Sequence, residues 1–171
     1  MNQSMNQRDM FFKWLYYAGA VLLLVLVQSL VLNRISVWAV HPFLPPVIAG
    51  IMAMLEGPAE GAVFGGIFGL LCDLTMPGVI PCFYTLAFLA AALPAAMIAK
   101  RLLSQGFLCA VLCAALALVI TDLLHTVLLT FRRGVELSAA LSLTGRELAV
   151  TVVLSPLVYL LLRSVHNRIL R

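Results

Sequence analysis

The sequence predicts an all-α integral membrane protein that crosses the bilayer several times as one bundle of helices. Of its 171 residues, 63% are hydrophobic and 11% are charged, and its mean hydropathy is +1.08. Soluble domains are about half apolar and about a quarter charged. Because this number of charges is too small to cover a water-facing surface, we expect one integral membrane domain over residues 1–171.

Six apolar stretches approach the length of about 20 residues that a spanning helix needs. Trp14, Tyr16 and Tyr17 form an aromatic belt at the start of the first stretch. The second and third stretches have short charge-free cores, so a re-entrant hairpin inside a four-span protein is the alternative to six full spans. Residues 132–146 form the longest polar connection. The predicted spans are residues 14–32, 43–55, 58–76, 82–99, 107–131 and 148–162.

The net charge of +4 comes from Lys and Arg residues that lie at the ends of apolar stretches. This placement is typical of membrane-flanking charges and argues against a nucleic-acid partner. With six spans, one side of the membrane carries seven positive residues and the other carries four, so the positive-inside rule places both termini in the cytoplasm. The seven are Arg8, Lys13, Lys100, Arg101, Arg163, Arg168 and Arg171, and the four are Arg34, Arg132, Arg133 and Arg146.

A ladder of glycines runs along the third predicted span. Gly57, Gly61, Gly65 and Gly69 recur every four residues, so on a helix they form one nearly straight stripe. Each Gly costs up to about 1 kcal/mol relative to Ala in a helix, so four in register need a packing reason. Two interpretations are open: close packing of helices within the chain, or docking of a partner's helix. Pro58 suits the first position of this helix.

Polar residues inside the predicted spans are the other candidates for function, because each is costly in lipid. Asp73 takes the next position of the glycine stripe. Asp122 and His125 share one face of the fifth span. These residues predict either two polar stripes packed together or a polar cavity that serves a ligand or a proton relay. The predicted buried polar residues are Asp73, Asp122, His125, Thr126, Thr151, Ser155 and Tyr159.

Catalytic motifs are missing from the sequence. Two membrane aspartates, Asp73 and Asp122, raise the hypothesis of an aspartic protease, but neither lies in a G-x-G-D motif, and no G-x-S-x-G is present. The four cysteines lack metal-ligand spacing and are expected to be small packed residues. We therefore expect no enzyme activity, no catalytic residue, no metal and no cofactor.

The segment EGPAEGAVFGGIFGLLCDLTMPG, residues 56–78, resembles the MreD family of rod shape-determining membrane proteins. That family carries a G-P-x-x-G-A…G…G-L-L-x-D-L signature at the corresponding place. Gln28 and Ser29, followed by Arg34 and an apolar interfacial stretch, also resemble the opening of the family. The signature is matched by Gly57, Pro58, Gly61, Ala62, Gly65, Gly69, Leu70, Leu71, Asp73 and Leu74.

The resemblance implies a non-enzymatic scaffold subunit of the bacterial cell-elongation machinery in the inner membrane. It would bind MreC, a single-span protein, and help couple MreB filaments to the peptidoglycan synthase RodA and its transpeptidase. Assembly into a homo-oligomer is also possible. The fold would resemble that of the substrate-binding components of energy-coupling-factor transporters. The alternative is a vitamin-binding subunit of such a transporter, with Asp122, His125 and Tyr159 lining its pocket.

Overall fold

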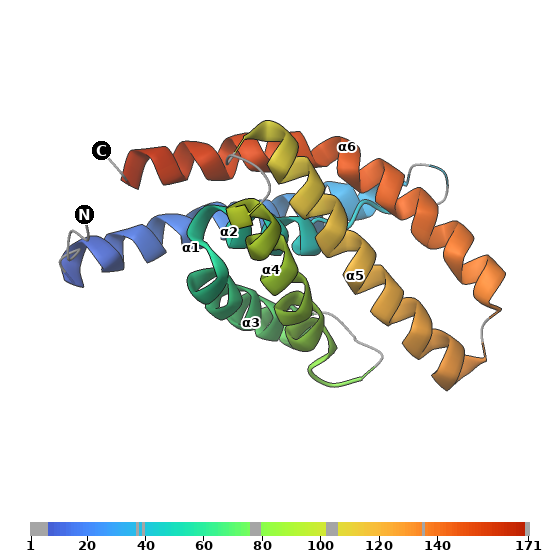
Figure 1. The fold of residues 1–171 in the computed structure, drawn as a ribbon. Helices are drawn as coiled ribbons and strands as arrows, with labels where there is room; N and C mark the ends of the chain where they lie inside the picture. The colour runs from blue at the N-terminus through green and yellow to red at the C-terminus, as the bar shows by residue number, and fades with distance from the viewer. Residues whose placement is uncertain are drawn as a thin grey trace.

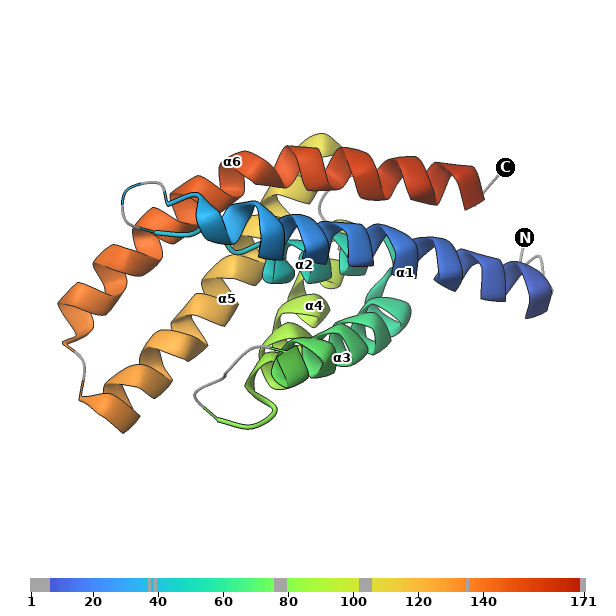
Figure 2. The same cartoon turned by 180° about the vertical axis from the view of Figure 1, so that it is seen from behind.

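The computed structural model describes residues 7–36, 38, 40–75, 80–101, 106–134 and 136–169. In these residues the chain folds into six α-helices and one short 3-10 helix (Figure 1). The first and last α-helices lie side by side (Figure 2). The start of the first helix and the end of the last helix lie at the same end of the molecule. The elements are α1 (Gln7–Leu30), η1 (Leu32–Arg34), α2 (Pro45–Glu56), α3 (Pro58–Thr75), α4 (Phe83–Arg101), α5 (Phe107–Arg133) and α6 (Leu137–Ile169).

Four segments of the described chain are long and apolar enough to cross a membrane, and they confirm the first, fourth, fifth and sixth predicted spans as helices of spanning length. This is the pattern of a multi-pass helical membrane protein. Helices α2 and α3 are not among these segments: α2 has 12 residues and α3 has 18, or about 18 Å and 27 Å at 1.5 Å per residue. The four segments are Phe12–Arg34, Phe83–Lys100, Phe107–Arg132 and Ala140–His166.

The predicted polar connection over residues 132–146 was wrong in extent, because most of it is helical. Helix α5 ends at Arg133, where Gly134 takes a left-handed conformation (φ 63°) and donates its N–H to the Thr130 carbonyl. Helix α6 already begins at Leu137. Ala140 is buried and Thr144 bonds to Thr126, so packing against α5 continues into this segment despite its polar residues.

Helix α2 forms the centre of the molecule. Every residue from Pro45 to Leu55 is buried, and α2 contacts α3, α4, α5 and α6. A helix that is apolar on all sides is expected in such a position. Gly50 allows a close approach of α2 to α5, since a Cβ there would lie 2.8 Å from the Cys113 carbonyl oxygen on α5. The second predicted span is therefore a core element enclosed by longer helices.

Non-helical backbone leads into α2, and polar side chains from two other helices satisfy its hydrogen bonds. The Gln28 amide donates to the Pro42 carbonyl at 2.8 Å and accepts from the Leu44 N–H at 3.1 Å. Thr151 on α6 accepts the Phe43 N–H at 3.2 Å. Gln28 and Thr151 are both buried. Irregular backbone is tolerated within a membrane only where protein supplies its partners, so these side chains make the start of α2 possible.

Candidate functional site

The glycine ladder packs against helices of the same chain. A Cβ at Gly61 would lie 2.5 Å from Cα of Ala53 on α2, and a Cβ at Gly69 would lie 2.6 Å from Cα of Thr85 on α4. A Cβ at Gly65 would lie 3.3 Å from the Phe88 carbonyl oxygen of α4. Of the two interpretations of the glycine stripe, the structure therefore favours close packing within the chain. Helices α2 and α4 occupy the stripe, so a partner's helix cannot dock there.

The start of the ladder forms the turn between α2 and α3. Gly57 follows the last residue of α2 with φ 88°, a conformation that favours glycine. Its N–H bonds to the Ala53 carbonyl. Pro58 is the first residue of α3, as expected.

Asp73 caps α4 and is half-buried. Its carboxylate accepts the backbone N–H groups of Tyr84 and Thr85 at 2.9 Å each, and the Thr85 hydroxyl at 2.6 Å. Cys82, which directly precedes α4, has no side chain suited to capping and takes a positive φ of 63°. Asp73 of α3 thus does for α4 what an N-cap residue of α4 would otherwise do. Its role is structural.

The predicted polar residues of α5 and α6 do not form a single site. Thr126 bonds to Thr144 across the two helices at 3.3 Å, and the Ser155 hydroxyl donates to the Val152 carbonyl at 2.7 Å. Tyr159 is buried near the opposite end, where it accepts from Arg163 at 2.8 Å and contacts the ring of Phe107. Tyr159 therefore does not share a pocket with Asp122 and His125.

Asp122 and His125 do line one small cavity of about 100 Å³, which we call the acidic cavity. It brings in Glu147 of α6, which the sequence had not singled out. Its volume is well below the roughly 300–1,000 Å³ typical of sites for drug-sized ligands, which argues against a vitamin-sized ligand there. The cavity is lined by Phe43, Phe83, Tyr84, Thr121, Asp122, His125 and Glu147.

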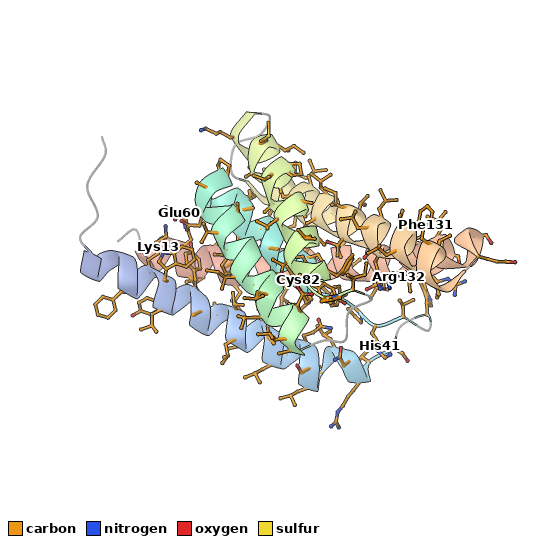
Figure 3. The ribbon with its side chains drawn as sticks, turned by 90° about the horizontal axis from the view of Figure 1, so that it is seen from below. Lys13, His41, Glu60, Cys82, Phe131 and Arg132 are labelled. Carbon is orange, nitrogen blue, oxygen red and sulfur yellow. The ribbon has the colours of Figure 1, made fainter. Side chains whose placement is uncertain are left out.

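A second group of polar residues, the terminal cluster, lies where the first turns of α1 approach the last turns of α6. The hydroxyl of Tyr17 donates to Glu56 at 2.5 Å and contacts Nδ1 of His166 at 2.7 Å. Lys13 forms ion pairs with Glu56 and Glu60. Two carboxylates face one ammonium group, so the cluster carries one negative charge when His166 is neutral. Figure 3 shows Lys13 beside Glu60, with His41 and Arg132 toward the other end. The cluster consists of Lys13, Tyr17, Glu56, Glu60 and His166.

Sequence reasoning missed this cluster. His166 was not among the predicted functional residues, yet it lies on α6 and contacts both Tyr17 and Glu56. Its partners lie 149 and 110 residues away in sequence. The available signal was Glu56 at the end of an apolar stretch, where a lone acid needs a positively charged partner.

An apolar groove runs between α1 and α3, with α2 at its base. Helix α1 packs chiefly against α6 and leaves this α1–α3 groove with a volume of about 450 Å³. On α1 the groove extends from Trp14 to Gln28, about 20 Å at the helical rise. Mostly apolar side chains line it, including Val21, Ile67 and Leu71. Tyr17 belongs to both the groove and the terminal cluster, so the groove ends at charged residues.

Comparison with family models, curated proteins and solved structures finds no match for this chain.

Proposed function

We propose that this chain is a non-enzymatic scaffold subunit of the MreD type, which binds the single-span protein MreC in the bacterial inner membrane. In this role it helps couple MreB filaments to peptidoglycan synthesis by RodA and its transpeptidase, and so acts in cell-shape control. The observation that carries the proposal is the α1–α3 groove, which has the length, apolar lining and lateral opening suited to one transmembrane helix. The resemblance over residues 56–78 supplies the identity of the partner.

The dimensions of the groove favour a helix as its occupant. Its length of about 20 Å covers most of a hydrocarbon core of about 30 Å. On the α3 side, Ile67 and Leu71 are 57% and 53% exposed, so they offer apolar side chains for knobs-into-holes packing. The glycine ladder serves this groove indirectly, because it fixes α3 against α2 and α4 while Ile67 and Leu71 stay exposed.

The terminal cluster supports a definite orientation for the partner. Under the proposed topology it lies on the cytoplasmic side, where the flanks of transmembrane helices are rich in Lys and Arg. Glu60 remains 51% exposed in its side chain while paired with Lys13. The surplus negative charge at this end of the groove would attract the basic cytoplasmic flank of a single-span helix.

The same cluster supports six crossings over a re-entrant hairpin. The turn between α2 and α3 holds Glu56 and Glu60, which pair with Lys13 in the first turns of α1. A re-entrant hairpin would place this turn in the hydrocarbon core, where such charges are costly. With the turn at the interface, α2 and its extended lead-in form the second crossing and α3 forms the third. Both termini then lie in the cytoplasm, as the positive-inside count predicts.

Filling the groove tests the proposal. We expect Ile67→Trp to lower co-purification of MreC at least about tenfold, because the indole occupies the space that the partner's helix needs. Val153→Trp is the matched control: Val153 lies on α6, is 77% exposed and does not line the groove, so co-purification should be unchanged. Retention of MreC by a folded Ile67→Trp protein would refute docking in this groove.

A further inference from the structure

The acidic cavity is assembled from four elements at the end away from the terminal cluster. Asp122 comes from α5 and Glu147 from α6, and the lead-in to α2 and the start of α4 complete the walls. Asp122 is 7% exposed, and its Oδ2 is buried with no hydrogen-bond partner among the described residues. A buried acceptor without a donor is rare in folded proteins. Oδ2 of Asp122 therefore lacks a donor that a bound group could supply.

The charges around the cavity favour a cationic donor. Its two carboxylates can only accept hydrogen bonds when ionised, and its described lining contains no Lys or Arg. The one basic side chain in the lining is that of His125. His41, in the lead-in segment, interacts electrostatically with Glu147. Two acids facing one imidazole leave the cavity negative whenever both carboxylates are ionised and His125 is neutral.

Aromatic rings form the remaining walls. Tyr84 lies 5.9 Å from Phe43 and 5.2 Å from Phe83, measured between ring centroids, and Phe83 lies 5.6 Å from the His125 ring. Aromatic faces attract cations and are the usual walls of sites for organic ammonium groups. A metal ion is less suited, because the described residues include no group of three His, Cys, Asp or Glu side chains that could hold one.

We propose that the acidic cavity binds a small primary ammonium group. Its N–H groups would donate to Asp122 and Glu147, and its short apolar part would lie against Phe83 and Tyr84. A volume of about 100 Å³ admits several water molecules or a group of two or three heavy atoms. A free amine and the ethanolamine headgroup of a lipid share this chemistry. The cavity is separate from the α1–α3 groove, so this site does not depend on the partner proposed above.

Thermal unfolding of the full chain in mild detergent tests the site, with ethylammonium chloride as the probe. We expect a saturable rise in melting temperature, because a ligand that binds only the folded state stabilises it. Sodium chloride at equal ionic strength and ethanol, the neutral counterpart of ethylammonium, should not reproduce it. Asp122→Asn and Glu147→Gln should each weaken binding at least about tenfold. Glu60→Gln removes an acid from the terminal cluster instead and should leave binding unchanged.

Saturation-transfer NMR on the unsubstituted protein gives an answer even if a cavity variant does not fold. Irradiation of aromatic protons should transfer saturation to the methylene group of ethylammonium and not to ethanol. Nanodiscs separate the two sources of the ammonium group. If the response to free ethylammonium persists in phosphatidylglycerol but disappears in phosphatidylethanolamine, the lipid headgroup occupies the site; if it persists in both, the ligand is a free amine. Equal shifts with ethylammonium and sodium chloride, together with no saturation transfer, would overturn the proposal.

Discussion

A single methyl group added at Gly69 tests how closely α3 and α4 must approach. A Cβ at this position would lie 2.6 Å from Cα of Thr85, 2.7 Å from the carbonyl oxygen of Tyr84 and 2.8 Å from the backbone nitrogen of Thr85. All three atoms belong to the backbone, so a change of side-chain rotamer cannot relieve the contact. In Gly69→Ala, α4 must move away, and its retreat also strains the bonds from Asp73 that cap it.

Gly66→Ala is the matched control on the same helix. Its Cβ would meet only the Leu89 side chain, at 3.6 Å, which is ordinary contact. Both substitutions gain the same helix propensity, about 1 kcal/mol, so the difference between them isolates the steric cost. Overpacking of a close contact costs about 1–3 kcal/mol. We therefore expect the free energy of unfolding of Gly69→Ala to lie about 1–3 kcal/mol below that of Gly66→Ala.

Unfolding in mixed micelles by titration with sodium dodecyl sulfate, followed by far-ultraviolet circular dichroism, measures this difference. Gly66→Ala should be as stable as the unsubstituted protein, or more stable by up to about 1 kcal/mol. If the two variants unfold at the same detergent fraction, the ladder does not set the distance between α3 and α4, and the packing account fails.

Two further predictions concern the start of α2 and the membrane topology. Gln28→Leu should lower the free energy of unfolding by at least about 2 kcal/mol in the same titration, because it leaves the Pro42 carbonyl and the Leu44 N–H unpaired. Ser29→Ala removes an exposed hydroxyl that donates only to the Val25 carbonyl of the same helix, so it should change the free energy of unfolding by less than about 0.5 kcal/mol. Equal effects of the two substitutions would contradict the role of Gln28. Cys82 is exposed, whereas the other three cysteines are buried. A membrane-impermeant maleimide added outside the cell should label Cys82 and not Cys82→Ser; labelling only after the membrane is opened would reverse the proposed orientation.

Local patterns in the sequence were sufficient to locate the long apolar helices, although not the first turns of α6. Hydropathy identified the four long apolar segments, and the spacing of four between glycines predicted a stripe for close packing. On α1, the buried residues Tyr17, Val21, Leu24 and Gln28 likewise follow helical periodicity. These features depend on residues within a few turns of one another, so they can be read without knowing which helices are neighbours.

The candidate sites depended on neighbours that sequence spacing does not reveal. Asp122 and His125 were correctly placed on one face, but Glu147 and the aromatic walls come from other elements. Tyr159 was grouped with them and lies elsewhere. Hydropathy measures only how apolar a stretch is, so it could not distinguish α2, enclosed on all sides, from a helix that faces lipid.

Composition and helical periodicity alone determine that this chain is a multi-pass helical membrane protein with a small-residue face on its third helix. Only the tertiary structure decided that this face meets α2 and α4, that Gln28 and Thr151 complete the backbone ahead of α2, and that His166 joins Tyr17 and Glu56. The physical reason lies in the range of the forces involved. Partition into lipid acts on each segment separately, whereas close packing and hydrogen bonding act only between atoms that the whole fold brings together.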